Sequence, residues 1–315
     1  MLAFSSFVAA ELAKSDLEIV VTGAGGWLGQ ATLEMLDQAF GEKLQSRVHI
    51  FAAKERQILL RSGRMLPCNE LKSMEKLHRR PCLVAHYAFV TKDRIADRSV
   101  PDFIHENESI GDFVATQLRR LPVAGIFVPS SGAVYPRGIE EYPVRNAYGE
   151  AKARDECRFR SLAENLRCRA VIMRIFNLSG PFINNLSTYV LASILLDLAK
   201  GGPIRLHADR PVIRSYVHVS DLINLAFSLM LRQVDPPSDP FDTAGEVEIE
   251  IGGLARLAAA VLGKPDTAII RSPISPHETD RYVGDGGIFR RLTTETGVAL
   301  TPLDQQIIDT SDYLR

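Results

Sequence analysis

Tyr148 and Lys152 lie four residues apart in the helical stretch "NAYGEAKARDE". At that spacing two side chains project from the same helix face, one turn apart. A free tyrosine has a pKa of about 10, too high for a base near neutral pH. A neighbouring ammonium favours the phenolate, so the pair predicts an acid/base group that exchanges a proton with a hydroxyl or a carbonyl. The same spacing also occurs in ordinary surface pairs, which is the alternative interpretation.

Ser131 ends the apolar stretch "IFVPSS", which has the pattern of a strand. A serine hydroxyl at that place can hydrogen-bond the oxygen on which the tyrosine acts and orient it. The catalytic candidates are therefore Ser131, Tyr148 and Lys152.

Gly23, Gly26 and Gly29 have the spacing GxxGxxG in "VTGAGGWLGQ", between an apolar strand and a helix. Glycines there allow a sharp turn, close approach of a pyrophosphate, and tight packing of the helix on the strand. The free N–H groups of the helix N-terminus then face the phosphates. The pattern predicts a dinucleotide site; the alternative is a glycine-rich turn that binds nothing.

The second expected strand ends in "HIFAAKER" and has no carboxylate at its tip, where NAD sites hold the adenosine ribose. Lys54 and Arg56 follow instead, and cations there can bind the 2′-phosphate of NADP. Alternatively, both belong to a solvated turn. The cofactor is thus predicted to be NAD(P), with a slight preference for NADP.

Strand-like and helix-like segments alternate, which predicts an α/β fold of the Rossmann type, a doubly wound parallel sheet with a smaller C-terminal substrate lobe. Residues 1–176, with 213–245 returning to them, are expected to form the NAD(P)-binding domain. Residues 177–212 and 246–315 are expected to form the substrate lobe. Residues 57–67 suggest a hairpin or a strand around Ser62 and Gly63.

The composition excludes several classes of protein. Lys and Arg number 37 against 38 Asp and Glu, so no global charge favours nucleic acid or an acidic membrane. The four cysteines have no metal-ligand spacing, which predicts reduced thiols and no metal site. No apolar run approaches the roughly 20 residues that span a bilayer. Residues 1–16 lack the basic start of an export signal and are expected to form a short packing helix or a frayed extension. A cytoplasmic protein is expected.

The motifs "TGAGGWLG", "SSGAVY" and "YGEAK", in this order and at these distances, resemble those of the extended short-chain dehydrogenase/reductases that act on nucleotide sugars. The resemblance covers nearly the whole chain. It implies an NAD(P)-dependent enzyme in which Trp27 and Leu28 of the first motif also contact the cofactor. In "LVAHYAF" it places His86 and Ala88 beside the cofactor, and in the next helix Asn107. For His86, a hydrogen-bonded core role is the preferred interpretation.

The resemblance also implies a substrate site. Asn177 in "RIFNLSGP" and Arg214 in "VIRSYVHVSDL" match positions that meet the nucleotide diphosphate, and Arg281 in the tail is a candidate second ligand. Arg281 could instead form a surface ion pair. Asp221, in the same "HVSDL", is expected to cap a helix N-terminus.

The implied reaction is oxidation or reduction at C4 of a nucleoside-diphosphate sugar, by an epimerase or a 4-keto reductase with the same catalytic residues. The family's 4,6-dehydratases have an acidic pair after the catalytic hydroxyl residue, and this chain has Gly132 and Ala133, so dehydration is not expected. The alternative is a non-catalytic NAD(P)-binding regulatory or scaffold protein of the same fold. The resemblance further implies a homodimer formed through two long helices.

Overall fold

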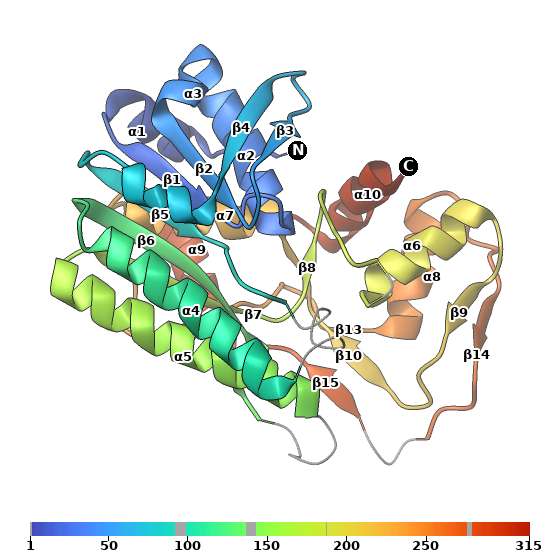
Figure 1. Ribbon diagram of the computed structural model, residues 1–315. Helices are drawn as coiled ribbons and strands as arrows, with labels where there is room; N and C mark the ends of the chain where they lie inside the picture. The colour runs from blue at the N-terminus through green and yellow to red at the C-terminus, as the bar shows by residue number, and fades with distance from the viewer. Residues whose placement is uncertain (1, 92–98, 137–142, 187, 276–278) are drawn as a thin grey trace.

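The computed structural model describes residues 2–91, 99–136, 143–186, 188–275 and 279–315. Its centre is an eight-stranded sheet in which only β3 runs antiparallel to its neighbour (Figure 1). The strands, in spatial order, are β12 (Phe241–Asp242), β7 (Arg169–Ile175), β6 (Val123–Ser131), β5 (Cys82–His86), β1 (Glu18–Thr22), β2 (Val48–Ala52), β4 (Met65–Glu70) and β3 (Arg56–Leu59). The predicted Rossmann-type α/β fold is confirmed.

Helices cover both faces of this sheet, because its central strands are apolar on both sides. On β1, Val20 packs into the core beneath α4 (Val100–Leu118) and α5 (Pro143–Leu166), whereas Val21 packs into the opposite core. That second core lies beneath α1 (Ser6–Lys14), α2 (Trp27–Phe40) and α7 (Val219–Met230). Figure 1 shows α4 and α5 side by side on one face. The N-terminal segment is the expected packing helix, with Val8 and Leu12 fully buried.

Successive strands are added first on one side of β1 and then, from β5 onward, on its other side. Strands β2, β4 and β3 extend to one side of β1, and β5, β6, β7 and β12 to the other. Ligands of such sheets bind outside the carboxyl ends of the strands at this switch point. The predicted hairpin is present as β3 and β4, with Gly63 at a φ of 84° in its turn. The remaining short elements near the sheet are η1 (Gly41–Lys43), α3 (Leu44–Arg47), η2 (Leu71–Lys76) and η4 (Gly132–Val134).

The second lobe is built from short strand pairs and three helices around a separate core. Its helices are α6 (Val190–Lys200), α8 (Ile251–Val261) and α10 (Leu303–Leu314). Its strands form two sets: β13 (Ile249–Glu250), β10 (Val212–Arg214) and β15 (Asp280–Tyr282) in one, and β9 (Ile204–Leu206) and β14 (Ile269–Arg271) in the other. A further parallel pair, β8 (Leu178–Ser179) and β11 (Val217–His218), packs through Leu178 and Val217 into the core of the large sheet. Helix α9 (Gly287–Thr296) falls in the range expected for this lobe, yet it packs on α7 and β12 beside the large sheet.

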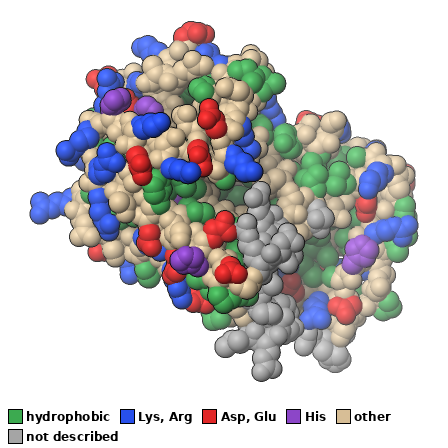
Figure 2. Space-filling model, in the orientation of Figure 1, with side chains coloured by type: hydrophobic (Ala, Val, Ile, Leu, Met, Phe, Trp, Pro, Cys, Tyr) green, Lys and Arg blue, Asp and Glu red, His purple; other side chains and the backbone are tan. Residues whose placement is uncertain are grey.

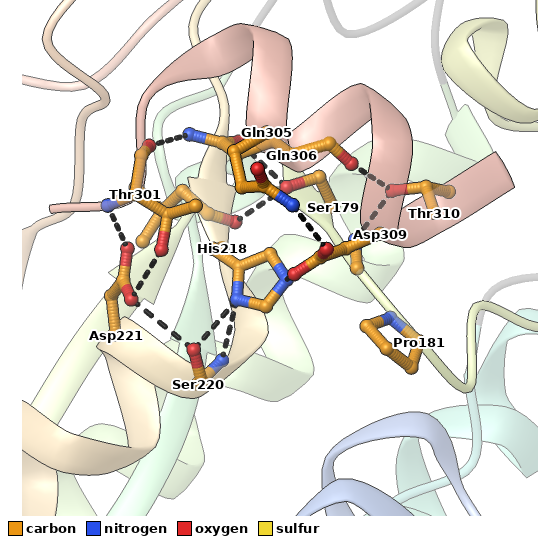
Figure 3. A network of polar contacts seen from close by, with 12 residues as sticks. Ser179, Pro181, His218, Ser220, Asp221, Thr301, Gln305, Gln306, Asp309 and Thr310 are labelled. Atoms are coloured by element: carbon orange, nitrogen blue, oxygen red, sulfur yellow. Dashed lines mark hydrogen bonds and ion pairs between the residues drawn. The ribbon is translucent and has the colours of Figure 1, made fainter. Parts of the chain in front are cut away.

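Polar contacts join α10 and the segment before it to the β8–β11 pair (Figure 3). The Ser179 hydroxyl donates to Gln306 at 2.6 Å, and the Gly180 N–H donates to the Thr310 hydroxyl at 2.8 Å. The expectation that Asp221 caps α7 is wrong. His218 is the N-cap, accepting from the Ser220 N–H, and the Asp221 carboxylate accepts from the N–H and the hydroxyl of Thr301.

Charges of both signs are interspersed over the face of the molecule that Figure 2 presents. Within the described part of the chain, no helix is long and apolar enough to cross a membrane.

Candidate active site

The three glycines of the first motif differ in what surrounds them. Gly23 follows β1 with a φ of 68°, and a Cβ there would lie 2.4 Å from the Tyr87 carbonyl carbon. A Cβ on Gly29 would lie 2.6 Å from the Cα of Ala24. Gly23 therefore allows the turn, and Gly29 allows α2 to approach it. At Gly26 the nearest atom to an added Cβ is the Gly23 carbonyl oxygen, at 3.4 Å.

Gly26 is also the N-cap of α2, and this residue makes no side-chain hydrogen bond to the first N–H groups of the helix. The turn thus leaves open backbone at the positive end of a helix dipole, beside the switch point of the sheet. This is the arrangement that accepts a pyrophosphate. The adjacent Leu28 packs against the core beneath α2.

The side chain of Trp27, a residue predicted to contact the cofactor, joins the turn to the second lobe. Its buried indole N–H donates to the Pro181 carbonyl at 2.7 Å, and its ring meets Tyr189 edge-on at 5.5 Å. The indole therefore fixes the first turn of α2 against the segment that follows β8.

Of the two cations after β2, Arg56 reaches the glycine turn. Its guanidinium lies so close to Gly25 that an added Cβ would be 1.2 Å from Nη2. Lys54 is exposed in the turn between β2 and β3. Arg56 thus lies against the backbone of the glycine turn.

The backbone after β5 is fixed by buried polar side chains. The Thr22 hydroxyl accepts from the Ala88 N–H at 3.2 Å and contacts His86 Nδ1 at 2.8 Å. Asn107 is buried, and its amide exchanges hydrogen bonds with both backbone groups of Val90. Asn107 therefore positions the segment that carries Ala88. Burial lowers the pKa of His86 to about 3, so the ring is neutral. This agrees with a core role for His86.

Lys152 and Tyr148 both border the ring of Phe89. The Lys152 ammonium lies 3.6 Å from the centre of that ring and donates to the Pro129 carbonyl at 2.9 Å. The half-buried Tyr148 ring packs edge-on against the Phe89 ring, with the two ring centres 5.7 Å apart. Burial lowers the pKa of Lys152 to about 8, against the opposing effect of Asp155 and Glu156. The ammonium is therefore mostly charged at neutral pH.

Ser131, at the carboxyl end of β6, is brought toward the same helix. A Cβ on Gly149 would lie 1.9 Å from the Ala133 carbonyl oxygen, so this glycine lets α5 pack directly on η4. The Ser131 hydroxyl accepts from the Ala133 N–H at 3.2 Å and lies 3.4 Å from the hydroxyl of Tyr282, on β15. The predicted catalytic residues thus occupy packed neighbouring elements.

A largely buried ion pair between Glu156 and Arg174 connects α5 to the strands at this end of the sheet. Glu156 on α5 accepts from Arg174 Nε and Nη2, at 2.9 and 2.7 Å, and from the Ser130 hydroxyl at 2.5 Å. Arg174 also donates to the hydroxyl of Tyr135, which donates to Asp242. The hydrogen bonds to Glu156 raise the pKa of Arg174. This network links α5, β6, β7 and β12.

The predicted substrate ligands are divided between two faces of a small sheet. β10 and β15 are parallel, with Arg214 opposite Tyr282 and Ile213 opposite Arg281. Because side chains alternate, Arg214 shares a face with Tyr282, and Arg281 lies on the other face. The structure therefore does not bring Arg214 and Arg281 together.

Each predicted ligand also has partners within the protein. Arg214 forms an ion pair with Asp280 at 2.6 Å, and the Asn177 amide donates to the carbonyls of Ser215 and Tyr282. The exposed Arg281 pairs with Glu248 and lines a cavity of about 370 Å³.

Two residues of the site, Phe89 and Tyr282, were not found from the sequence. In the sequence, Phe89 follows the predicted residue Ala88, and Tyr282 follows the predicted residue Arg281. An aromatic side chain next to a candidate ligand was the available signal, but its direction depends on strand pairing that the sequence does not show.

Comparisons with known proteins agree with this fold. No curated protein sequence matches the chain. Solved structures do, including a UDP-N-acetylglucosamine 4-epimerase from Methanobrevibacter ruminantium M1, with a TM-score of 0.71, 18% identity, and coverage of 95% of this chain and 98% of that one. A UDP-glucuronic acid 4-epimerase from Bacillus cereus was solved with UDP-glucuronic acid and NAD. It has a TM-score of 0.69 and 16% identity, and the match covers 95% of this chain and 99% of that one.

A dTDP-glucose 4,6-dehydratase from Streptomyces venezuelae, solved with NAD, gives a TM-score of 0.70 at 17% identity and covers 95% of this chain and 97% of that one. At such identities the likeness shows the fold. The sequence itself carries the family assignment, because residues 19–241 match the profile of the NAD-dependent epimerase/dehydratase family. The chain belongs to that family.

Proposed function

We propose that this protein uses NAD(P) to oxidise or reduce C4 of a nucleoside-diphosphate sugar, as an epimerase or a 4-keto reductase. The observation that carries the proposal is the close packing of α5, which bears Tyr148 and Lys152, on the turn after Ser131, beside the switch point of the sheet. The nucleotide sugars bound to solved structures of this fold support the substrate class.

The residues present fit a dinucleotide, because Gly26 leaves backbone open at the start of α2. Bound NAD(P) supplies the hydride acceptor or donor. Tyr148 takes the proton of the C4 hydroxyl during oxidation and returns a proton to the carbonyl oxygen during reduction. The Lys152 ammonium favours the phenolate, and the Ser131 hydroxyl hydrogen-bonds the same oxygen.

Dehydration does not fit the residues after Ser131. A Cβ on Gly132 would lie 2.5 Å from the ring of Phe176, so a carboxylate side chain there would have to displace that ring. Ala133 is buried and has no group that can exchange a proton.

Arg214 and Asn177 are the proposed diphosphate ligands, because both border Tyr282, whose hydroxyl lies beside that of Ser131. Arg281 is left out of this set because it lies on the opposite face of the strand pair. We also propose that two copies of the chain pair through α4 and α5, a state that sedimentation analysis measures.

The position of Arg56 supports NADP, since its guanidinium lies over the glycine turn and can bind a 2′-phosphate. We expect Arg56→Ala to weaken NADPH binding at least about tenfold and leave NADH binding within about twofold of wild type. Lys54→Ala is the matched control. Fluorescence titration of the reduced cofactors measures both, and equal losses for NADPH and NADH would argue against a 2′-phosphate contact.

The test of the reaction is Tyr148→Phe, which removes one hydroxyl. Loss of an acid/base group should lower kcat at least about 100-fold while cofactor binding persists. Tyr313→Phe, on α10 in the second lobe, is the control. Turnover is followed by chromatography of nucleotide-sugar epimers and by NADPH consumption with 4-keto sugars. Near-normal turnover by Tyr148→Phe would refute the proposed role; cofactor binding without turnover by wild type would favour a regulatory or scaffold protein.

A further inference from the structure

We infer that Tyr282 is a positioning residue of the catalytic centre, which directs the hydroxyl hydrogen of Ser131 toward the substrate oxygen. The inference rests on the proposed function. Its first observation is the distance of 3.4 Å between the Tyr282 and Ser131 hydroxyl oxygens, which belong to residues 151 positions apart in two different lobes.

The Ser131 oxygen can accept two hydrogen bonds and donate one. The Ala133 N–H already donates to it, at 3.2 Å. When the Tyr282 hydroxyl donates as well, both acceptor positions are filled and the serine hydrogen must point elsewhere. The remaining direction is available to a substrate oxygen, and a hydroxyl that accepts two hydrogen bonds is a stronger donor.

Several contacts hold the Tyr282 ring in this place. It packs on Phe176, with ring centres 4.7 Å apart. Phe176 is itself confined by two glycines, because a Cβ on Gly132 or Gly284 would lie 2.5 or 2.7 Å from its ring. These contacts place the Tyr282 ring beside Ser131.

The backbone of Tyr282 connects it to the proposed diphosphate ligands. Its carbonyl accepts from the Asn177 amide at 3.1 Å, and its strand is paired with that of Arg214. The Arg214 guanidinium lies 5.9 Å from the centre of the Tyr282 ring and is paired with Asp280 on the same strand. A diphosphate bound by Asn177 and Arg214 would thus fix the position of β15. Tyr282 on this strand would then hold the Ser131 hydroxyl in its orientation when substrate is bound.

The experiment is a double-mutant cycle with Tyr282→Phe and Ser131→Ala, measured in steady-state kinetics. We expect Tyr282→Phe alone to lower kcat about 10-fold or more and to change KM for the nucleotide sugar less than about 3-fold. In the Ser131→Ala background the same substitution should cost less than about 2-fold, because its effect passes through Ser131. Tyr216→Phe is the control, since the buried Tyr216 hydroxyl has no hydrogen-bond partner among the described residues.

A wild-type kcat for Tyr282→Phe would overturn the inference, as would an equal loss in both backgrounds, which indicates a structural effect. The same cycle in thermal unfolding tests the contact without turnover. We expect the two Tm changes to be non-additive by about 2 °C, and additive changes would overturn the inference. Failure of wild type to turn over any nucleotide sugar would instead count against the proposed function and leave the unfolding cycle to decide on the contact.

Discussion

Replacing Gly26 with alanine should separate cofactor binding from folding. The φ and ψ of Gly26 are −82° and 175°, an extended conformation open to any residue, and the nearest protein atom to an added Cβ is 3.4 Å away. The protein therefore has room for the methyl group. Alanine is a poorer N-cap than glycine, so we expect the free energy of unfolding to fall by only about 0.5 kcal/mol.

A bound pyrophosphate would meet that methyl group directly. Forcing one methyl group into a close contact costs about 2 kcal/mol, which corresponds to a roughly 30-fold weaker affinity for NAD(P)H. Fluorescence titration of the reduced cofactors measures the affinity, and urea unfolding measures the stability.

Gly29→Ala is the matched control. Its methyl group would lie 2.6 Å from the Ala24 Cα, so the strain arises within the protein. We expect it to cost about 1–3 kcal/mol of stability in the absence of any ligand. Gly26→Ala protein that binds both cofactors as tightly as wild type would refute the placement of the pyrophosphate at this turn.

Two further predictions concern stability. Glu156→Ala leaves Arg174 as a largely buried cation without its bidentate partner, and we expect a loss of about 3 kcal/mol in urea unfolding; a change under about 1 kcal/mol would contradict this. Burial lowers the pKa of His86 to about 3 and of His218 to about 4, so between their ordinary value near 6.5 and pH 4 the unfolded chain binds protons that the native chain does not. Stability should therefore fall as pH falls through this range, by up to about 1.4 kcal/mol per pH unit for each histidine. Thermal unfolding from pH 7 to 4 measures the slope, and an unchanged Tm would count against buried neutral histidines.

Local sequence features predicted the elements well. Alternating strand-like and helix-like runs gave the sheet and its helices, and a turn at Ser62 and Gly63 gave the β3–β4 hairpin. These features depend on periodicity and turn chemistry, which act over a few residues. The spacing of Gly23, Gly26 and Gly29 likewise predicted a turn whose three positions have different surroundings.

Contacts between segments that are distant in the sequence were harder to predict. Arg214 and Arg281 both match ligand positions, but the register of β10 on β15 places them on opposite faces. Asp221 has a side chain typical of an N-cap, yet its partner is Thr301, 80 residues away, and His218 caps the helix. Trp27 follows the glycine motif, but its indole is engaged by Pro181. Single-sequence patterns contain no information on such pairings.

Helix α7 forms hydrogen bonds with segments near both ends of the printed sequence. Asn224 exchanges hydrogen bonds with the backbone of Ala3 and Ser5, and Asp221 accepts from Thr301. These contacts join residues separated by 80 to 221 positions, and such long loops are entropically costly to close early. During synthesis, residues 3–5 emerge more than 200 residues before their partner, so α1 and α7 cannot complete their common layer until most of the chain has left the ribosome. Docking of the N-terminal helix and of the segment around Thr301 on α7 is therefore expected among the last events of folding.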